Sequence, residues 1–437
     1  MTDFKDFVAG KRVTLMGLGL LGRGIGDARF LAEHGAQLTV TDRKDEAALA
    51  SSLQQLSEFS NIRYVLGEHR MDDFQNADMV IKAAGVPLHS PYIRAARDAG
   101  VPVFMSTALF AKFARAAGAN LVGITGTRGK STVTHMIHHG LVCTARRAHL
   151  GGNVRGLSTL ALLPSIKSGD FAILELDSWQ LQGFGDLRLS PHVAVFTNLL
   201  MDHLNYYPDM DAYFSDKANI FKFQKPGDAL FVGAQVQERV ARERPPVAAV
   251  VPKPIPDAWR LQVAGQHNRD NAGLAAAALQ ALGLSNEDIR RGLESFKPVE
   301  GRLQFIDEWR GVKIYNDNNA TTPDATVAAL EAFPGQRIVL IAGGADKGIP
   351  LDALAREVQA RTKAIVLLPG TGTDRLKPLL ARFSEAKDMT EAVEKAFAEA
   401  KPGDLLLLSP GFASFGLYVN EYERNDAFIQ AIRSMRE

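Results

Sequence analysis

The chain contains a glycine-rich segment whose residue types suit the binding of a nucleotide phosphate. Residues 126–132 read GTRGKST, after an apolar run that we interpret as a strand and before a segment that we interpret as a helix. The strict phosphate-loop spacing fails by one residue, because Gly123 and Gly129 enclose five residues instead of four. A tight glycine turn at a helix N-terminus still directs backbone N–H groups at an anion. We expect Lys130 to reach the β- and γ-phosphates and the Ser131 hydroxyl to bind Mg²⁺. Every residue of this loop is expected to contact the nucleotide: Gly126, Thr127, Arg128, Gly129, Lys130, Ser131 and Thr132.

A second glycine turn stands near the N-terminus. Residues 17–22 read GLGLLG after a predicted strand, and Asp42 lies twenty residues beyond Gly22. This spacing is typical of a dinucleotide site in which the acidic residue binds a ribose. NAD or a nucleotide-sugar would each satisfy the pattern, so the turn alone leaves both open.

Polar residues at the ends of two further predicted strands could bind a metal ion. Glu175 lies in the apolar run 171–176, where a carboxylate near a phosphate loop is well placed for Mg²⁺. His203 follows the run 193–197, and Lys217 comes fourteen residues later. A solvated carboxylate and a structural histidine are equally compatible with these patterns. An ammonium group is repelled by a metal, so Lys217 indicates a surface or phosphate-binding lysine unless it is converted to an anion.

Parallel α/β scaffolds must position these residues. The apolar runs predict strands at 12–16, 37–41, 79–83, 101–104, 120–124, 171–176, 193–197, 337–341, 364–368 and 404–408. The helical patterns fall at 24–34, 110–117, 269–282, 325–332, 351–360, 389–400 and 423–434. The five prolines within 239–256 predict a surface loop, and FKPVEGR at 296–302 predicts a linker. This order predicts the α/β class with three consecutive domains, at 1–110, 111–298 and 299–437.

Composition excludes several classes of protein. The chain of 437 residues carries 50 Lys and Arg against 49 Asp and Glu, so no bulk field attracts nucleic acid or an anionic membrane. A hydrophobic fraction of 46% with 23% charged residues is that of a globular protein. The single cysteine, Cys143, excludes an intramolecular disulfide. Because no signal peptide or membrane span is recognisable, we expect a cytoplasmic protein with small-molecule partners.

Read in order, these and further segments resemble the Mur ligase family of ATP-dependent enzymes that form amide bonds. The segments are GLGLLG at 17–22, GTRGKST at 126–132, GGN at 151–153, LELDSWQL at 174–181, the pair at 202–203, Lys217, GQHNRDN at 265–271, GR at 301–302, NDNNAT at 316–321, GGADKG at 343–348 and LSPGFAS at 408–414. The resemblance implies a Rossmann-like UDP-binding domain, a phosphate-loop ATPase-type central domain and a Rossmann-like C-terminal domain that binds an amino acid. It further implies that D-glutamate is joined to UDP-N-acetylmuramoyl-L-alanine in peptidoglycan precursor synthesis, by a monomer.

The resemblance also implies a role for individual residues. The implied catalytic residues are Lys130, His203 and Lys217. ATP and Mg²⁺ are the implied cofactors, with two metal ions held by Ser131, Glu175, His203 and a carbamylated Lys217. The adenosine would contact His267, Asn268, Asn271, Arg302 and Asp317. The UDP-substrate would contact Gly19, Leu20, Leu21, Asp42, Arg43, Gly85, Asn153 and His203. The amino acid would contact Thr321, Lys347, Ser414 and Tyr418.

Three positions and one segment depart from the family pattern. The segment AAGVP at 83–87 lacks the Ser-Pro-Gly that is often seen on the UDP-substrate side. Arg128 stands where the family usually has Asn, and Asp177 stands where Ser is usual. Asn319 replaces a lysine that helps to bind the incoming amino acid in the family. The identity and stereochemistry of the acceptor therefore stay open at this point.

The implied reaction solves a chemical problem, because a carboxylate does not react with an amine in water. ATP would phosphorylate the substrate carboxylate, the amine would attack the acyl phosphate, and phosphate would leave. A related ligase with another acceptor, such as L-glutamate, L-alanine or a folate-type polyglutamate chain, stays open because of Asn319. An NAD-dependent oxidoreductase would leave the phosphate loop without a function, and a non-catalytic nucleotide-binding protein would release no ADP.

Overall fold

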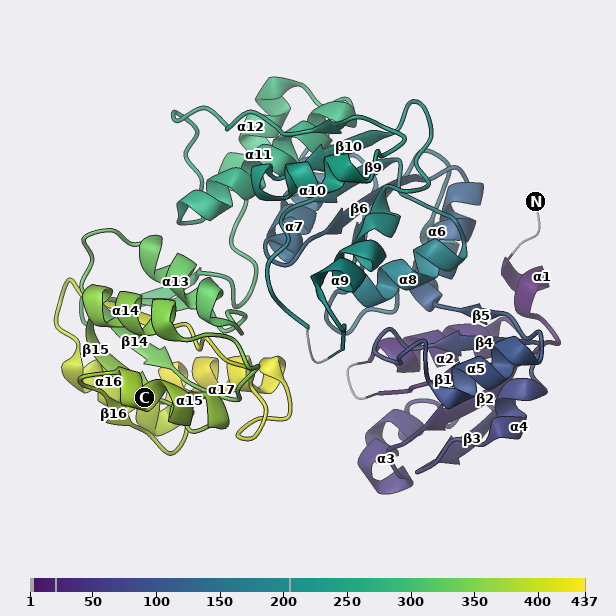
Figure 1. Ribbon diagram of the computed structural model, residues 1–437, viewed down its shortest axis with the longest axis horizontal. Helices are drawn as coiled ribbons and strands as arrows, with labels where there is room; N and C mark the ends of the chain where they lie inside the picture. The colour runs from purple at the N-terminus through teal and green to yellow at the C-terminus, as the bar shows by residue number, and fades with distance from the viewer. Residues whose placement is uncertain (1–3, 20–21, 204–205, 437) are drawn as a thin grey trace. The chain divides into compact units, whose positions relative to one another are not determined.

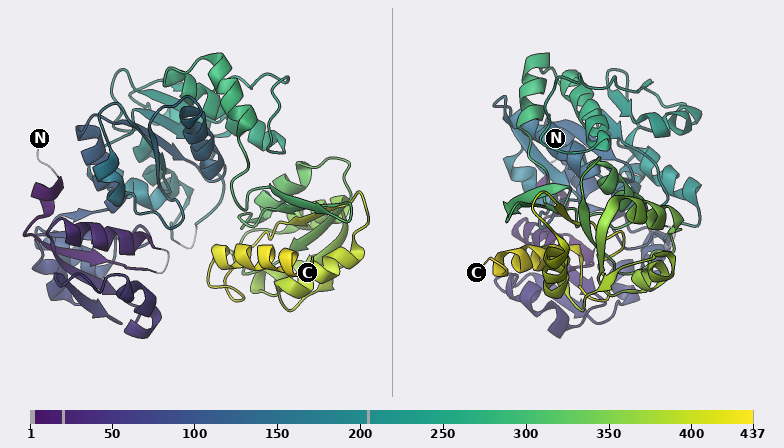
Figure 2. Two further views of the ribbon diagram at one scale, coloured as in Figure 1. Left: turned by 180° about the vertical axis from the view of Figure 1, so that it is seen from behind. Right: turned by 90° about the vertical axis from the view of Figure 1, so that its left-hand side faces the viewer.

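The computed structural model describes residues 4–19, 22–203 and 206–436. The chain forms two compact units, Met1–Lys253 with Leu274–Ile289, and Pro254–Gly273 with Arg290–Glu437. The units contain three sheets, each accompanied by helices (Figures 1 and 2). Within the described ranges, no helix has both the length and the apolarity needed to cross a bilayer.

The first unit begins with a five-stranded parallel sheet in the order β3-β2-β1-β4-β5. The strands are β1 (Arg12–Met16), β2 (Gln37–Asp42), β3 (Ile62–Leu66), β4 (Met79–Lys82) and β5 (Val103–Phe104). The helices are α1 (Phe4–Val8), α2 (Arg23–Glu33), α3 (Glu46–Gln54), α4 (Met71–Gln75) and α5 (Pro91–Asp98). Leu15 packs in one buried cluster with Leu31 of α2, and Val80 packs in another with Ile93 of α5. The strand order reverses between β1 and β4, where α/β sheets of this kind bind ligands.

The same unit contains a six-stranded parallel sheet in the order β11-β10-β9-β6-β8-β7. Its strands are β6 (Asn120–Thr125), β7 (Ala148–Gly152), β8 (Phe171–Glu175), β9 (Val193–Phe196), β10 (Ala229–Val232) and β11 (Ala249–Val250). The helices are α6 (Ser106–Ala116), α7 (Lys130–Val142), η1 (Leu160–Ser165), α8 (Ser178–Asp186), α9 (Met210–Lys217), η2 (Ala218–Ile220), η3 (Ala234–Val236) and α10 (Gln237–Arg242). The central strands β6, β8 and β9 are almost wholly buried, which explains their continuous apolar sequences.

The second unit contains a mixed sheet in the order β12-β13-β17-β14-β15-β16, in which only β12 is antiparallel to its neighbour. Its strands are β12 (Gln304–Trp309), β13 (Val312–Asn316), β14 (Ile338–Ala342), β15 (Thr362–Leu367), β16 (Ser384–Glu385) and β17 (Leu405–Leu408). Its helices are α13 (Pro323–Glu331), α14 (Asp352–Arg361), α15 (Thr371–Leu376), η4 (Lys377–Leu379), α16 (Met389–Glu399) and α17 (Glu421–Ser434). Helices α11 (Gln266–Ala281) and α12 (Asn286–Ser295) contribute residues to both units.

The α/β class predicted from the sequence is confirmed. The prediction of a loop over 239–256 was wrong in part, because the segment contains the end of α10 and strand β11. Strand β11 is the edge strand of its sheet, and it pairs through Ala249 and Val250 with β10. Prolines are tolerated there because an edge strand has one side without a hydrogen-bonded neighbour.

Candidate active site

The phosphate loop lies between β6 and α7, as the sequence predicts. Gly126 has φ of +141°, and a Cβ on it would lie 1.9 Å from the Thr197 hydroxyl oxygen. Gly129 has φ of +82° and is the N-cap of α7. Both positions therefore require glycine. The first amide groups of α7, which have no acceptor within the helix, open toward the loop and suit an anion.

The segment after β9 fixes the shape of this loop. The Asn198 carbonyl accepts the Thr127 N–H at 2.9 Å, and the Asn198 side-chain oxygen accepts the Arg128 N–H at 2.9 Å. The Thr197 hydroxyl donates to the Arg128 carbonyl at 2.5 Å. Because residues 127 and 128 give their amide groups to the protein, we expect the phosphates to bind at the start of α7.

Two lysines converge on the carbonyl of Gly126. Lys130 Nζ donates to the carbonyls of Gly126 and Thr127 at 3.1 Å each, and Lys217 Nζ donates to Gly126 at 2.8 Å. Lys217 is 1% exposed, and its Nζ lies 4.7 Å from the centre of the Tyr213 ring. Burial, and then the charge of Lys130, lower the pKa of Lys217 well below its usual range. Lys217 is thus a buried lysine whose surroundings shift its equilibrium toward the neutral amine, and not the surface lysine that its sequence context left open.

The carboxylate of Asp202 links the phosphate loop to His203. Arg128 Nη1 donates to Asp202 Oδ2 at 3.0 Å, and His203 Nε2 lies 3.8 Å from the same oxygen. His203 has a left-handed backbone with φ of 57°, and its ring centre lies 5.0 Å from that of Trp179. The departure at Arg128 therefore places a cation against Asp202 at the edge of the loop.

Glu175 lies at the end of β8 and is 4% exposed. The neighbouring strand β7 ends at Gly152, where a Cβ would lie 2.0 Å from the Glu175 carbonyl oxygen. The Asn153 N–H donates to that same carbonyl at 2.8 Å. The glycine allows the two strand ends to approach closely, and it brings Asn153 next to Glu175.

The oxygen donors beside the loop suit Mg²⁺ that arrives with a nucleotide. Among the residues that the structure describes, no three His, Cys, Asp or Glu side chains form a group that could hold a metal ion. Mg²⁺ in nucleotide sites usually takes one or two protein oxygens and completes its shell with phosphates and water. The Ser131 hydroxyl and the Glu175 carboxylate are donors of this kind.

Asp177, the second departure, caps a helix. Its Oδ1 accepts the Gln180 N–H at 2.7 Å, and its own N–H donates to Gln180 Oε1 at 3.2 Å. This reciprocal capping box starts α8. Serine makes the same kind of cap, so the substitution leaves the local structure unchanged.

The carboxylate of Asp42 binds the N-terminal glycine turn itself. Its Oδ2 accepts the N–H groups of Leu18 and Gly19 at 2.9 and 3.0 Å, and its Oδ1 accepts the Lys44 N–H at 3.0 Å. Asp42 therefore shapes the turn, which the sequence pattern did not reveal, and its contact with a ligand stays a prediction. The neighbouring Arg43 is exposed. The predicted contacts Leu20 and Leu21 lie outside the described residues.

Contacts of α2 join this glycine turn to Asn153, and no sequence pattern predicted them. Arg23 Nη1 donates to the Asn153 side-chain oxygen at 2.8 Å, and the Ser158 hydroxyl donates to Asp27 at 2.6 Å. A Cβ on Gly26 would lie 2.5 Å from the Ser158 Cβ, so α2 packs closely on the segment that follows β7. The predicted UDP-substrate residues Gly19 and Asn153 are thus connected within one unit.

The predicted adenosine residues lie in the second unit. Asn268 Nδ2 donates to the Ala264 carbonyl at 2.7 Å, and Asn271 Nδ2 donates to Asn268 at 3.2 Å. Burial lowers the pKa of His267, which favours the neutral imidazole. Asp317 accepts bonds from the Leu303 N–H and the Ser409 hydroxyl, and burial raises its pKa to about 7. Arg302, the last of these predicted residues, precedes Leu303.

The predicted amino-acid residues occupy three loops of the second unit. Lys347 Nζ donates to the Thr321 hydroxyl at 3.2 Å. The Tyr418 N–H donates to the Ser414 carbonyl at 3.2 Å, and burial raises the pKa of Tyr418 to about 12. Asn319, the third departure, donates from Nδ2 to the Glu300 carbonyl at 3.1 Å.

Arg424 at the start of α17 holds two of these loops, and the sequence analysis missed it. Its guanidinium donates to the side-chain and backbone oxygens of Asn318 at 2.8 and 2.9 Å and to the Phe412 carbonyl at 3.1 Å. The side chain is 1% exposed, and burial lowers its pKa to about 10. An arginine in a polar helical segment resembles any surface arginine in sequence, so no pattern could have singled it out.

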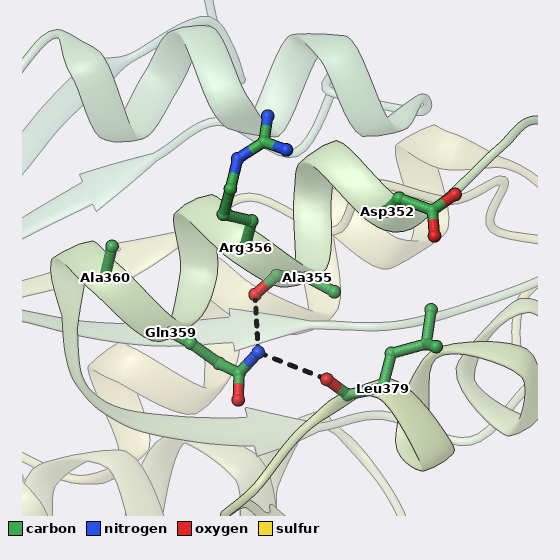
Figure 3. A pocket seen from close by; sticks show the side chains of 6 residues that line it. All are labelled: Asp352, Ala355, Arg356, Gln359, Ala360 and Leu379. Carbon is green, nitrogen blue, oxygen red and sulfur yellow. Dashed lines mark hydrogen bonds between the residues drawn. The ribbon is translucent and has the colours of Figure 1, made fainter.

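A depression on the second unit contains none of these residues. It is lined by Asp352, Ala355, Arg356, Gln359, Ala360 and Leu379 (Figure 3). Gln359 Nε2 bridges the carbonyls of Ala355 and Leu379 at 3.1 Å each. This amide is already satisfied by the protein, and we assign no ligand to the depression.

Three family models match the chain: "Mur ligase MurD-like, N-terminal domain" at 11–105, "Mur ligase middle domain" at 124–251, and "Mur ligase, glutamate ligase domain" at 301–412. A UDP-N-acetylmuramoylalanine--D-glutamate ligase of Roseiflexus sp. is 38% identical over 98% of this chain and 99% of its own length. The ligase of the same name from Anaeromyxobacter dehalogenans is 36% identical over 96% of both chains.

Solved structures share the fold. The UDP-N-acetylmuramate-alanine ligase MurC of Thermotoga maritima matches with a TM-score of 0.62 and 18% identity, over 97% of this chain and all (100%) of its own. The MurF ligase of the same organism, solved with ADP, matches with a TM-score of 0.58 and 17% identity, over 82% of this chain and 90% of its own. The predicted three-domain α/β architecture is thereby confirmed.

Proposed function

The chain belongs to the Mur ligase family, and from this premise we infer that it joins D-glutamate to UDP-N-acetylmuramoyl-L-alanine in peptidoglycan synthesis. The reaction consumes ATP and releases ADP and phosphate. The observation that carries the substrate assignment is the match, over nearly the whole chain, to ligases that add D-glutamate. In this structure, the phosphate loop at the start of α7 supports the use of ATP.

The chemistry proceeds in two steps. An oxygen of the substrate carboxylate attacks the γ-phosphorus of ATP, and the bond to the β-phosphate oxygen breaks to give ADP and an acyl phosphate. The glutamate amine, in its neutral form, then attacks the carbonyl carbon to give a tetrahedral intermediate. Loss of phosphate and of the amine proton completes the amide bond.

We propose that the loop residues 126–132 bind the ATP phosphates. The first amide groups of α7 face the anion, and Lys130 exchanges its bonds to the Gly126 and Thr127 carbonyls for bonds to phosphate oxygens. The ammonium group then opposes the negative charge that moves with the transferred phosphoryl group.

We further propose that Ser131, Glu175 and His203 hold Mg²⁺ together with a carbamylated Lys217. Bound Mg²⁺ would neutralise charge on the phosphoryl group. Carbamylation needs a neutral amine, because the nitrogen lone pair attacks CO₂ and a proton is released. Lys217 meets this need through its lowered pKa, and the carbamate nitrogen keeps one N–H for the Gly126 carbonyl.

The remaining predicted residues are proposed to bind the three substrates. The residues assigned to the UDP-substrate are Gly19, Leu20, Leu21, Asp42, Arg43, Gly85, Asn153 and His203. The adenosine residues are His267, Asn268, Asn271, Arg302 and Asp317, and the amino-acid residues are Thr321, Lys347, Ser414 and Tyr418.

The proposed domain bounds are 1–110, 111–298 and 299–437. We also propose a cytoplasmic monomer. The one cysteine, Cys143, is exposed and is not part of a disulfide, as is usual in reducing compartments.

The test is ADP release with UDP-N-acetylmuramoyl-L-alanine and Mg²⁺-ATP, comparing D-glutamate with L-glutamate and other amino acids. Turnover that requires D-glutamate supports the proposal and shows that Asn319 is a tolerated substitution. Turnover only with another amino acid would move the specificity but keep the ligase chemistry. An absence of turnover with every acceptor would contradict the assignment of the UDP-substrate.

A further inference from the structure

A buried lysine that the reaction does not use stands at the carboxyl end of β4. Lys82 is the last residue of this strand and is 2% exposed. It is one of the largest fully buried side chains of the described residues. Strand β4 is the neighbour of β1, across the point where the strand order reverses. Ligands of parallel α/β sheets bind at the carboxyl ends of the strands at this point.

The ammonium group of Lys82 gathers the carbonyls of the loop that follows it. Nζ donates to the Val86 carbonyl at 2.8 Å and lies 3.4 and 3.5 Å from the carbonyl oxygens of Ala84 and Ala83. The Val86 N–H donates back to Ala83 at 3.1 Å and closes the turn. A loop whose carbonyls face one internal cation has a defined shape, because each carbonyl loses a partner if the loop opens.

This loop lies against the N-terminal glycine turn. The Ala83 N–H donates to the Met16 carbonyl at 2.8 Å, and a Cβ on Gly17 would lie 2.9 Å from the Ala83 Cβ. Among the described residues, the amide groups of Ala84 and Gly85 have no hydrogen-bond acceptor. The loop with these two amide groups therefore lies against the glycine turn at the strand-order reversal.

The carboxylates near Lys82 are engaged by other groups. Asp186 faces Arg97 at 3.4 Å, Asp216 accepts bonds from Gln182 and Tyr207, and Asp177 caps α8. Burial is the largest effect on Lys82 and lowers its pKa to about 8. The charge of Arg97 also lowers this pKa, whereas the three carboxylates raise it. The direct partners of Nζ are therefore loop carbonyls, not a carboxylate.

Stability alone does not account for this lysine, because an apolar side chain of similar length would avoid the cost of burying a charge. We propose that Lys82 is a positioning residue for the UDP-linked substrate, holding the carbonyls of Ala83, Ala84 and Val86 inward so that the loop presents its remaining amide groups to the diphosphate. This inference rests on the proposed function, because it needs a nucleotide-diphosphate ligand at this sheet.

The first test compares Lys82→Met with Val80→Ala, a buried control two residues earlier in the same strand. We expect Lys82→Met to raise the Kd and KM for UDP-N-acetylmuramoyl-L-alanine about tenfold, as the loss of one charge-assisted hydrogen bond predicts. The KM for ATP and for D-glutamate should change little. Val80→Ala should lower the thermal midpoint without changing the Kd. An unchanged Kd in Lys82→Met, or an equal rise in Val80→Ala, would overturn the proposal.

The second test uses pH and does not depend on the methionine variant folding. Lys82 is charged below pH about 8 and neutral above it, so wild-type affinity for the UDP-substrate should weaken between pH 7 and pH 9. Lys82→Arg keeps its charge over this range. A weakening of affinity that both proteins share therefore comes from titration of the ligand and not from residue 82. A wild-type Kd that is constant, or that changes only as much as in Lys82→Arg, would overturn the role of Lys82. A wild-type chain that does not bind the UDP-substrate at any pH would instead contradict the proposed function.

Discussion

Lys217 Nζ donates a 2.8 Å hydrogen bond to the carbonyl of Gly126, the first residue of the phosphate loop. The lysine comes from the last turn of α9, and the glycine directly follows β6. A buried amine beside a phosphate loop, close to a second lysine, is costly for folding. Its position is explained if the nitrogen takes part in the reaction, and the proposed carbamylation would give it that role.

We expect Lys217→Met to reduce kcat about 10²-fold or more, because methionine keeps the length of the side chain but cannot form a carbamate. Lys225→Met, at an exposed lysine nearby, should be neutral. Wild-type enzyme prepared free of CO₂ should regain activity when bicarbonate is added, and the variant should not. Activity of Lys217→Met near that of the wild type would contradict this role.

Lys130→Met should abolish ADP release, since the side chain loses the charge that opposes the transferred phosphoryl group. Thermal unfolding should change little, because Lys130 is only partly buried and water can replace its hydrogen bonds to the carbonyls of Gly126 and Thr127. Lys167→Met, at an exposed lysine, is the control and should retain full activity. ADP release by Lys130→Met within tenfold of the wild type would contradict the assignment of the loop.

The sequence predicted the scaffold well where apolar runs are buried on both faces. Strand β1 falls at the predicted residues, as its run RVTLM, buried from Val13 onward, suggests. The hairpin of β12 and β13 was missed, because β12 reads QFIDEW and lies partly exposed at a sheet edge. Edge strands lack the apolar pattern that marks a central strand.

The phosphate loop was predictable because its residues are close in sequence, whereas the supporting contacts are not. Three charged groups bind backbone groups in this way: the carboxylate of Asp42, the buried ammonium of Lys82 and the guanidinium of Arg424. Any charged residue could make such bonds, so the sequence carries no signal for them. The choice depends on burial, which only the tertiary structure determines.

Arg128→Asn should change ATP affinity without changing the reaction. The substitution removes the 3.0 Å ion pair with Asp202, in which the arginine side chain is 23% exposed and the aspartate 7%. We expect a few-fold change in the KM for ATP, with product identity unaltered. Asp202→Asn alone and the double variant complete a cycle, in which unfolding by urea should show a coupling of about 1 kcal/mol. Additive effects of the two substitutions would show that the pair does not interact in solution.

Asp177→Ser should leave stability nearly unchanged, because serine can accept the same N–H bond at the start of α8. Asp177→Ala, the matched control, removes the cap and should lower the free energy of unfolding by about 1 kcal/mol. Chemical denaturation of both variants measures the difference. Equal destabilisation by serine and alanine would indicate that the carboxylate charge, not the cap, is what the site requires.

Asp27→Asn should remove a pH dependence of stability that originates where α2 packs on the segment after β7. Burial raises the pKa of Asp27 to about 6, although hydrogen bonds from Ser158 and Ser106 and the charge of Arg23 oppose this rise. Between pH 4 and pH 6, the unfolded chain ionises at this residue while the folded chain stays protonated. The folded state therefore binds more protons, and the free energy of unfolding falls as the pH rises, by up to about 3 kcal/mol from this residue.

Asparagine does not titrate and can still accept the hydrogen bond from Ser158. The free energy of unfolding of the variant should therefore increase relative to that of the wild type as the pH rises. Urea unfolding of both proteins at pH 4.5 and pH 7 measures the free-energy difference between them. Subtracting one protein from the other cancels the titration of groups that both share, such as Asp317, whose raised pKa acts in the same direction. A difference in free energy of unfolding that is independent of pH would contradict this prediction. It would mean that Asp27 ionises in the folded protein as readily as in the unfolded chain, and that water reaches its carboxyl group where α2 packs on the segment after β7.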